Sequence, residues 1–105
     1  MNGSIDSMIN DILEKIARGY VNTKKEWLAD KKNGFKDGKL LGYYEAKEAL
    51  ISALNAEKPL NDVLEILAIQ YSRAKADWLS DKRNAFKDGK FLASYEVLNM
   101  VPAAN

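Results

Sequence analysis

The sequence predicts an all-α fold in which two tandem-duplicated helical hairpins form a pseudo-two-fold four-helix domain. Three observations support this prediction: a long phrase occurs twice, apolar residues recur at three- and four-residue steps, and each copy contains Lys-Asp-Gly-Lys. The chain has 105 residues, of which 47% are hydrophobic and 30% are charged. This length and composition fit one globular domain over residues 1–105.

The repeat is long enough to indicate a duplication. Residues 27–45, WLADKKNGFKDGKLLGYYE, reappear at 78–96 as WLSDKRNAFKDGKFLASYE. The match extends over 36 aligned positions, of which 20 are identical. Such a density indicates the tandem duplication of one supersecondary unit. We place the first unit at about residues 5–54 and the second at about 60–101, joined by the linker 55–59.

Each unit is expected to begin with a long helix of roughly 30 residues, because its apolar residues follow helical spacing. In the first unit this stripe contains Ile5, Ile9, Ile12, Leu13, Ile16, Tyr20, Trp27, Leu28 and Phe35. In the second unit it contains Leu60, Val63, Leu64, Leu67, Tyr71, Trp78, Leu79 and Phe86. Since the stripe continues through both phenylalanines, we place the break after them, at Lys-Asp-Gly-Lys. Gly38 and Gly89 then supply left-handed caps, because glycine adopts a positive φ without steric cost.

A shorter helix of roughly 12 to 15 residues is expected after the Asp-Gly turn of each unit. Its apolar stripe contains Leu40, Leu41, Tyr44, Leu50, Ile51 and Leu54 in the first unit, and Phe91, Leu92, Tyr95 and Leu98 in the second. A short helix covers only part of its long partner, so residues 5–20 and 60–71 need further apolar neighbours. These segments are expected to pack on each other, on the opposite unit or on a second chain, which leaves a homodimer as an alternative.

The residue types present exclude several kinds of chemistry. The chain contains no cysteine and no histidine, which excludes disulfides, thiolate catalysis and imidazole ligands. Acidic residues recur in both copies, but no nucleophile, phosphate-binding loop or cofactor motif accompanies them. We therefore expect a protein that is not an enzyme and that holds no cofactor. The net charge of +1 provides no overall attraction for polyanions.

The helix–Asp-Gly-Lys–helix segment resembles the calcium-binding loop of the EF-hand family over about a dozen residues in each copy. With Gly38 at loop position six, Asn33 and Asp37 occupy ligand positions one and five. Phe35 and its counterpart Phe86 occupy position three, where an oxygen ligand is required, and tyrosine replaces the glutamate of position twelve. We therefore predict that the chain has no metal site and that both phenylalanines are buried.

Lysines and aromatic residues alternate along one predicted helix face. Tyr20, Lys24, Trp27 and Lys31 are spaced by four, three and four residues, and the second unit repeats this series. In one interpretation the rings and cations bind bases and phosphates, or an acidic protein surface. In the other, the lysine stems cover rings that belong to the core. The candidate partner-binding residues are Lys24, Lys31, Lys36, Lys39, Lys75, Lys82, Lys87 and Lys90.

The expected function is that of a non-enzymatic helical interaction protein, a small adaptor or inhibitor that binds another macromolecule through surfaces presented twice. A protein is the expected partner, and the alternative is nucleic acid bound by the lysine–aromatic faces. A third hypothesis is a small-molecule pocket between the hairpins. The N-terminal sequence lacks the basic flank and apolar block of a signal peptide, and the apolar stretches are too short to span a membrane. We therefore expect a cytoplasmic protein without a membrane partner.

Overall fold

The computed structural model describes the backbone of residues 2–101 and the side chains of residues 7–101. Four helices account for nearly all of this backbone: α1 (Asn2–Ala29), α2 (Gly34–Asn55), α3 (Leu60–Ser80) and α4 (Ala85–Asn99). No strand occurs within the described range. The all-α prediction is therefore confirmed.

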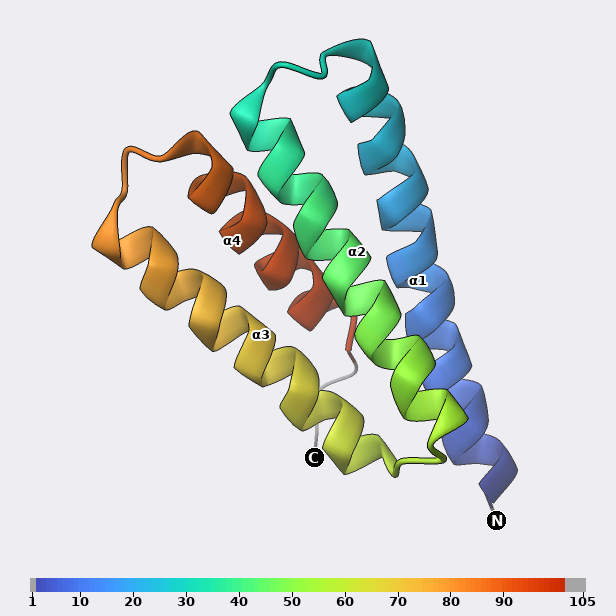
Figure 1. Cartoon of the computed structure of the whole chain (residues 1–105). Coiled ribbons are helices and arrows are strands. Elements are labelled where there is room, and N and C mark those ends of the chain that lie inside the picture. The colour runs from blue at the N-terminus through green and yellow to red at the C-terminus, as the bar shows by residue number, and fades with distance from the viewer. Residues whose placement is uncertain (1, 102–105) are drawn as a thin grey trace.

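The four helices form two hairpins whose second helices meet at the centre (Figure 1). α2 and α4 lie side by side, α1 packs on α2, and α3 packs mainly on α4. The turns at 30–33 and 81–84 lie at one end of the molecule, and the connector at 56–59 lies at the other (Figure 1). Each hairpin thus contributes one inner helix and one outer helix.

The helices break earlier than the sequence analysis predicts. α1 ends at Ala29 and α3 ends at Ser80, so the predicted break at Lys-Asp-Gly-Lys is wrong. Gly38 and Gly89 lie inside α2 and α4, and no glycine within residues 2–101 has a positive φ. The four helices have 28, 22, 21 and 15 residues, so the inner helix of the first hairpin is longer than expected.

Two asparagines set the start of the inner helices. Asn33 and Asn84 are the N-caps of α2 and α4, with the same extended backbone conformation, φ −83° and ψ 110°. Their side-chain oxygens accept hydrogen bonds from the backbone N–H groups of Lys36 and Lys87, each at 3.1 Å. An asparagine in this position satisfies a backbone donor that the helix itself leaves without a partner. This local interaction explains why both breaks precede the glycines.

Removing either cap should destabilise the fold. We expect Asn33→Ala and Asn84→Ala each to lower the free energy of unfolding by about 1 kcal/mol. Asn55, exposed at the last position of α2, provides the matched control, and its replacement by alanine should cost only tenths of a kcal/mol. Urea unfolding followed by circular dichroism measures all three. Equal effects at Asn33 and Asn55 would contradict the capping role.

One buried cluster connects all four helices. Its largest fully buried side chains belong to the outer helices α1 and α3 and to Leu50 of α2; the outer-helix members are Ile9, Ile12, Ile16, Val63 and Leu67. The inner helices add mostly smaller residues, including Ala46, Ala53 and Ala93. The N-terminal halves of the outer helices therefore bury most of their described apolar stripes within the chain, which is one of the arrangements expected for them. The side chain of Ile5 lies outside the described residues.

Several large apolar residues of the predicted stripes lie at the surface instead. The exposed ones are Leu28, Tyr44, Leu79, Phe86 and Tyr95, and the half-buried ones are Trp27, Phe35 and Trp78. The predicted burial is thus wrong for Phe86, which is 38% exposed, and only partly met by Phe35. The cause is that α2 and α4 meet through small residues: a Cβ added to Gly42 would lie 2.6 Å from the Cβ of Ala93. Helices this close leave no space for large side chains between them.

Gly38 and Gly89 make this close approach possible. A Cβ on Gly38 would lie 1.9 Å from the backbone oxygen of Phe86, and one on Gly89 would lie 2.0 Å from the backbone oxygen of Phe35. The two contacts are reciprocal, because each glycine faces the residue three positions before the other. The repeated Asp-Gly sequence therefore serves helix packing, not a turn.

Candidate functional site

Each turn carries an exposed lysine whose ammonium lies over a tryptophan ring. Lys31 Nζ is 5.6 Å from the ring centroid of Trp27, and Lys82 Nζ is 5.4 Å from that of Trp78. These distances are within the range of cation–π attraction. The predicted pairing of lysines with aromatic rings is therefore present at both turns, with nearly equal geometry.

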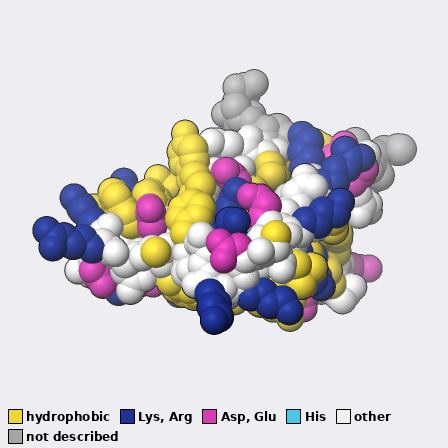
Figure 2. Space-filling model, turned by 90° about the horizontal axis from the view of Figure 1, so that it is seen from above, with side chains coloured by type: hydrophobic (Ala, Val, Ile, Leu, Met, Phe, Trp, Pro, Cys, Tyr) yellow, Lys and Arg dark blue, Asp and Glu magenta, His cyan; other side chains and the backbone are white. Residues whose placement is uncertain are grey.

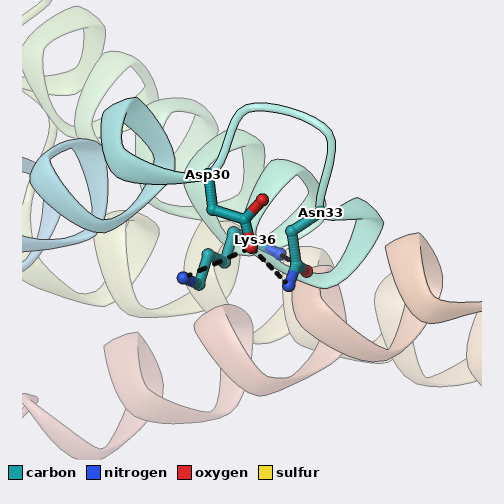
Figure 3. A network of polar contacts seen from close by, with 3 residues as sticks. All are labelled: Asp30, Asn33 and Lys36. Carbon is teal, nitrogen blue, oxygen red and sulfur yellow. Dashed lines mark hydrogen bonds and ion pairs between the residues drawn. The ribbon is translucent and has the colours of Figure 1, made fainter.

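The 30–33 turn also holds a local polar network (Figure 3). Asn33 Nδ2 donates to the Asp30 carboxylate at 3.2 Å, and Lys36 Nζ lies 3.8 Å from the same carboxylate. Lys36 is half-buried and is held against its own turn. Its charge is therefore partly offset before any partner binds.

The remaining candidate lysines are distributed over several elements. Lys24 and Lys75 are exposed on the outer helices, and Lys39 and Lys87 are half-buried on the inner helices. Lys90 Nζ lies 3.0 Å from Glu45 Oε1, so it forms an ion pair between α4 and α2. The eight lysines are not brought together into one site. Figure 2, a view onto the end with the turns, shows Lys and Arg side chains interspersed with acidic and apolar ones.

Exposed leucines accompany the two lysine–tryptophan pairs. Leu28 and Leu79, one residue after each tryptophan, are both 51% exposed. An exposed leucine is common by itself, but the same exposure at both equivalent positions gives each turn an apolar component.

An open apolar groove lies between α1, α2 and the start of α4. Its volume is about 360 Å³, and its lining residues are Tyr20, Asp37, Leu40, Leu41, Tyr44 and Phe86. The rings of Tyr20 and Tyr44 lie 6.2 Å apart along it. Lys47 Nζ lies 5.1 Å and 5.4 Å from the centroids of these two rings, which places a cation beside the tyrosine pair of the groove. At Asp37, the carboxylate accepts a hydrogen bond from the Trp27 indole at 2.7 Å.

The second unit fills the corresponding space. The rings of Tyr71 and Tyr95 are 6.4 Å apart, close to the spacing of the tyrosine pair in the first unit. Phe91, which stands where the first unit has Leu40, stacks on Trp78 with ring centroids 5.0 Å apart. Its ring also lies 5.6 Å from that of Tyr71. The larger side chain therefore occupies the position that Leu40 leaves open.

A polar cleft of about 390 Å³ lies between α2, α3 and α4. Its charged lining residues are Glu45, Glu48, Arg73, Asp77 and Lys90. Gln70 Nε2 donates to the backbone oxygen of Glu45 at 3.3 Å across this cleft. The lining mixes both signs of charge and includes an internal ion pair, so it selects no single class of ligand.

The two units differ at inner-helix positions beside this cleft. Ser94 lines it, whereas the equivalent residue of the first unit is Tyr43, which is buried. The Tyr43 ring packs so closely on Gly19 that a Cβ there would lie 2.3 Å from its Cε1 atom. Its hydroxyl donates to Glu96 Oε1 at 2.5 Å. Burial, followed by this hydrogen bond and the charge of Glu96, raises the pKa of Tyr43 well above its ordinary value.

The polar cleft lies between the two hairpins, where the third hypothesis places a small-molecule pocket. The residues that line the two openings were not predicted, because the candidate residues were chosen among positions that the units share. Shared residues such as Gly38 and Gly89 turn out to pack the helices. The openings occur at positions that differ, Leu40 against Phe91 and Ser94 against Tyr43. A change of side-chain volume between equivalent positions was the available signal.

The described residues contain neither a metal-binding cluster nor a helix able to cross a membrane. No group of three or more Asp and Glu side chains within them is arranged to hold a metal ion. The segment that resembles an EF-hand loop lies mostly inside α2, where the backbone is helical. No helix of this part of the chain combines the length and apolar character of a membrane span.

The two turns repeat one lysine–tryptophan–leucine group, whereas the groove and the cleft each belong to one unit. Comparison with protein-family models, with curated proteins and with solved structures finds no match to this chain.

Proposed function

We propose that the chain is a non-enzymatic helical interaction protein, a small adaptor or inhibitor that binds another protein through the end that carries its two turns. The observation behind this proposal is the repeated surface group. Lys31 with Trp27 and Leu28, and Lys82 with Trp78 and Leu79, have matching ring distances and exposures. Tryptophan, with apolar and cationic groups beside it, is typical of protein interfaces.

The duplicated units are further proposed to pair about a pseudo-two-fold axis that passes between α2 and α4. The reciprocal contacts of Gly38 with Phe86 and of Gly89 with Phe35 support this arrangement. Two turns at one end of such a pair would present the surface group twice to a partner.

A protein fits this surface better than nucleic acid, the alternative partner. Acidic and apolar side chains are interspersed with the basic ones at this end (Figure 2). The faces of Trp27 and Trp78 already carry lysine ammonium groups, and the rings are half-buried. Binding of single-stranded nucleic acid uses free aromatic faces in a continuous basic groove.

Charge reversal at the turns tests this proposal. We expect the combined change of Lys31, Lys36, Lys82 and Lys87 to glutamate to abolish capture of the cellular partner. The helical circular dichroism and the melting curve should change little. Lys31 and Lys82 are exposed, where a substitution usually costs only tenths of a kcal/mol. Lys36 and Lys87 are half-buried in the first turns of α2 and α4, where a glutamate interacts favourably with the helix N-terminus. Affinity capture from the source cells, with and without nuclease, followed by mass spectrometry, provides the measurement.

A matched control separates a local effect from a change in net charge. The same four-fold charge reversal at Lys15, Arg18, Lys58 and Arg73, which are exposed and at least seven residues from either turn, should leave capture intact. Undiminished capture by the turn variant would refute the proposed surface. Loss of the captured species on nuclease treatment would favour the nucleic-acid alternative.

A further inference from the structure

The apolar groove of the first unit results from two differences between the units. Leu40 stands where the second unit has Phe91, and Lys47 stands where it has Leu98. The first difference leaves space between Tyr20 and Tyr44, and the second places an ammonium group over both rings. Together they give an apolar groove with a cation at one end.

The shape of the groove suits side chains presented by a larger molecule. Its volume of about 360 Å³ is at the lower end of the roughly 300–1,000 Å³ found for small-ligand pockets. Small-ligand pockets enclose most of their ligand, whereas this groove is open along the surface between α1 and α2. Aliphatic side chains of a docked segment would contact Leu40, Leu41 and the parts of the Tyr20 and Tyr44 side chains that line the groove.

The charges at the two ends of the groove differ. Lys47 Nζ lies at one end, and its ion pair with Glu48, at 3.4 Å, is partly exposed and therefore weak. Lys24 Nζ lies 5.9 Å from the Tyr20 ring, one helical turn nearer to Trp27. At Asp37, the carboxylate already accepts the Trp27 indole hydrogen bond. A negative group on the occupant would therefore be favoured at the end near Lys47.

We propose that this groove docks a segment of a partner protein in which aliphatic side chains stand next to an acidic residue. The inference rests on the proposed protein-binding function and specifies the chemistry of the partner. It also makes the interaction asymmetric, because Phe91 fills the corresponding space of the second unit.

Matched peptides test the chemistry directly on the whole chain. The probe is a short helical peptide that combines leucines and glutamates, compared with versions in which lysine replaces each glutamate or serine replaces each leucine. Proton–nitrogen NMR titration follows the two indole N–H signals. The leucine–glutamate peptide should shift the Trp27 signal, because this indole is bonded to Asp37 at the groove, and leave the Trp78 signal unchanged. The other two peptides should bind at least about tenfold more weakly.

Residues of the second unit can be introduced at the equivalent positions of the groove to test it. Leu40→Phe should weaken binding of the leucine–glutamate peptide by about tenfold or more. The fold should tolerate it, because Phe91 occupies the equivalent site between the same types of residue. Lys47→Leu introduces the residue of the second unit. It should weaken binding of the leucine–glutamate peptide but not binding of a version in which glutamine replaces each glutamate. Phe91→Leu, a volume change outside the groove, should leave binding at the first unit unchanged.

Several outcomes would overturn the inference: no saturable shift with the leucine–glutamate peptide, equal binding of the lysine version, or binding unaffected by Leu40→Phe. Decanoate binding in preference to the peptide would assign the groove to a small carboxylate instead. Dissociation of a dimer by Leu40→Phe, detected by light scattering, would assign it to a second copy of the chain.

Capture from cells separates this inference from the proposed function. If the charge-reversed turn variant no longer captures the partner but the Leu40→Phe variant still does, the groove inference alone is refuted. Capture kept by both variants would refute both.

Discussion

Replacing Gly38 or Gly89 by alanine should destabilise the protein by about 2–3 kcal/mol at each position, the upper part of the roughly 1–3 kcal/mol expected when a packed contact is overfilled. A Cβ at either site would lie about 2 Å from a backbone oxygen of the opposite inner helix. A backbone oxygen cannot rotate away as a side chain can, so α2 and α4 would have to separate. In an ordinary helix interior the same substitution stabilises by about 0.5–1 kcal/mol, so the expected effect has the opposite sign.

Gly34 provides the control for this prediction. A Cβ there would lie 3.7 Å from the Cβ of Ala85, which is normal van der Waals contact, and the second unit already has alanine at the equivalent position. Gly34→Ala should therefore be neutral or slightly stabilising. The double variant at Gly38 and Gly89 should cost less than the sum of its parts, because one separation of the helices relieves both clashes. Denaturant unfolding measures each variant, and stabilisation by Gly38→Ala would refute the close approach of the two helices.

The sequence was sufficient to predict helices and their approximate number. The three- and four-residue spacing of residues such as Ile9, Ile12 and Ile16 has a direct physical cause, since a helix buries one face. The same spacing predicted which residues of the outer helices α1 and α3 contribute to the core. These features depend on the order of residues within one segment, which the sequence contains in full.

The position of the helix breaks was predicted incorrectly because two signals competed. Glycine at 38 and 89 favours a turn by its conformational freedom, whereas asparagine at 33 and 84 favours a helix start by capping. Both pairs recur in the repeat, so recurrence did not distinguish them. The glycines are explained by a contact with another helix, and this contact depends on tertiary packing that a pattern within one segment does not contain.

The candidate surfaces were predicted only in part. The lysine–tryptophan pairs were predicted from spacing along one helix face. The structure contains both pairs, but Lys31 and Lys82 lie in the turns just beyond the ends of α1 and α3. The groove at Leu40 requires knowledge of what surrounds that residue. A leucine and a phenylalanine are equivalent in an apolar pattern, yet in this fold Phe91 packs on two neighbouring rings, whereas Leu40 lines an open groove.

Replacing Tyr43 by serine, the residue at the equivalent position of the second unit, should lower the free energy of unfolding by about 3–5 kcal/mol. Tyr43 is only 3% exposed and belongs to the buried cluster, so its removal leaves a cavity against Gly19 and unpairs Glu96. A loss of this size is a large share of the roughly 5–15 kcal/mol that typically stabilises a domain. Calorimetry or urea unfolding provides the measurement.

Tyr43→Phe separates the hydroxyl from the ring. It keeps the packing and removes the hydrogen bond to Glu96, so it should cost about 1.5–3 kcal/mol, as expected for a bond to a charged group. The raised pKa of Tyr43 means that the folded state holds this proton more tightly than the unfolded state, where the value is about 10.0. The stabilisation is therefore complete below pH 10 and declines by about 1.4 kcal/mol per pH unit above it. The difference in stability between wild type and Tyr43→Phe should accordingly narrow above pH 10.

Gly19 provides a test of whether the ring itself causes the effect of Tyr43→Ser. In the wild type, Gly19→Ala should be destabilising, because its Cβ would collide with the Tyr43 ring at 2.3 Å. In the Tyr43→Ser background that ring is gone, and the same change should become stabilising by about 0.5–1 kcal/mol, the normal preference of a helix interior for alanine over glycine. This reversal of sign isolates the contact between the two residues from any general weakening of the fold. If Gly19→Ala has the same effect in both backgrounds, the ring of Tyr43 does not determine the packing at this position.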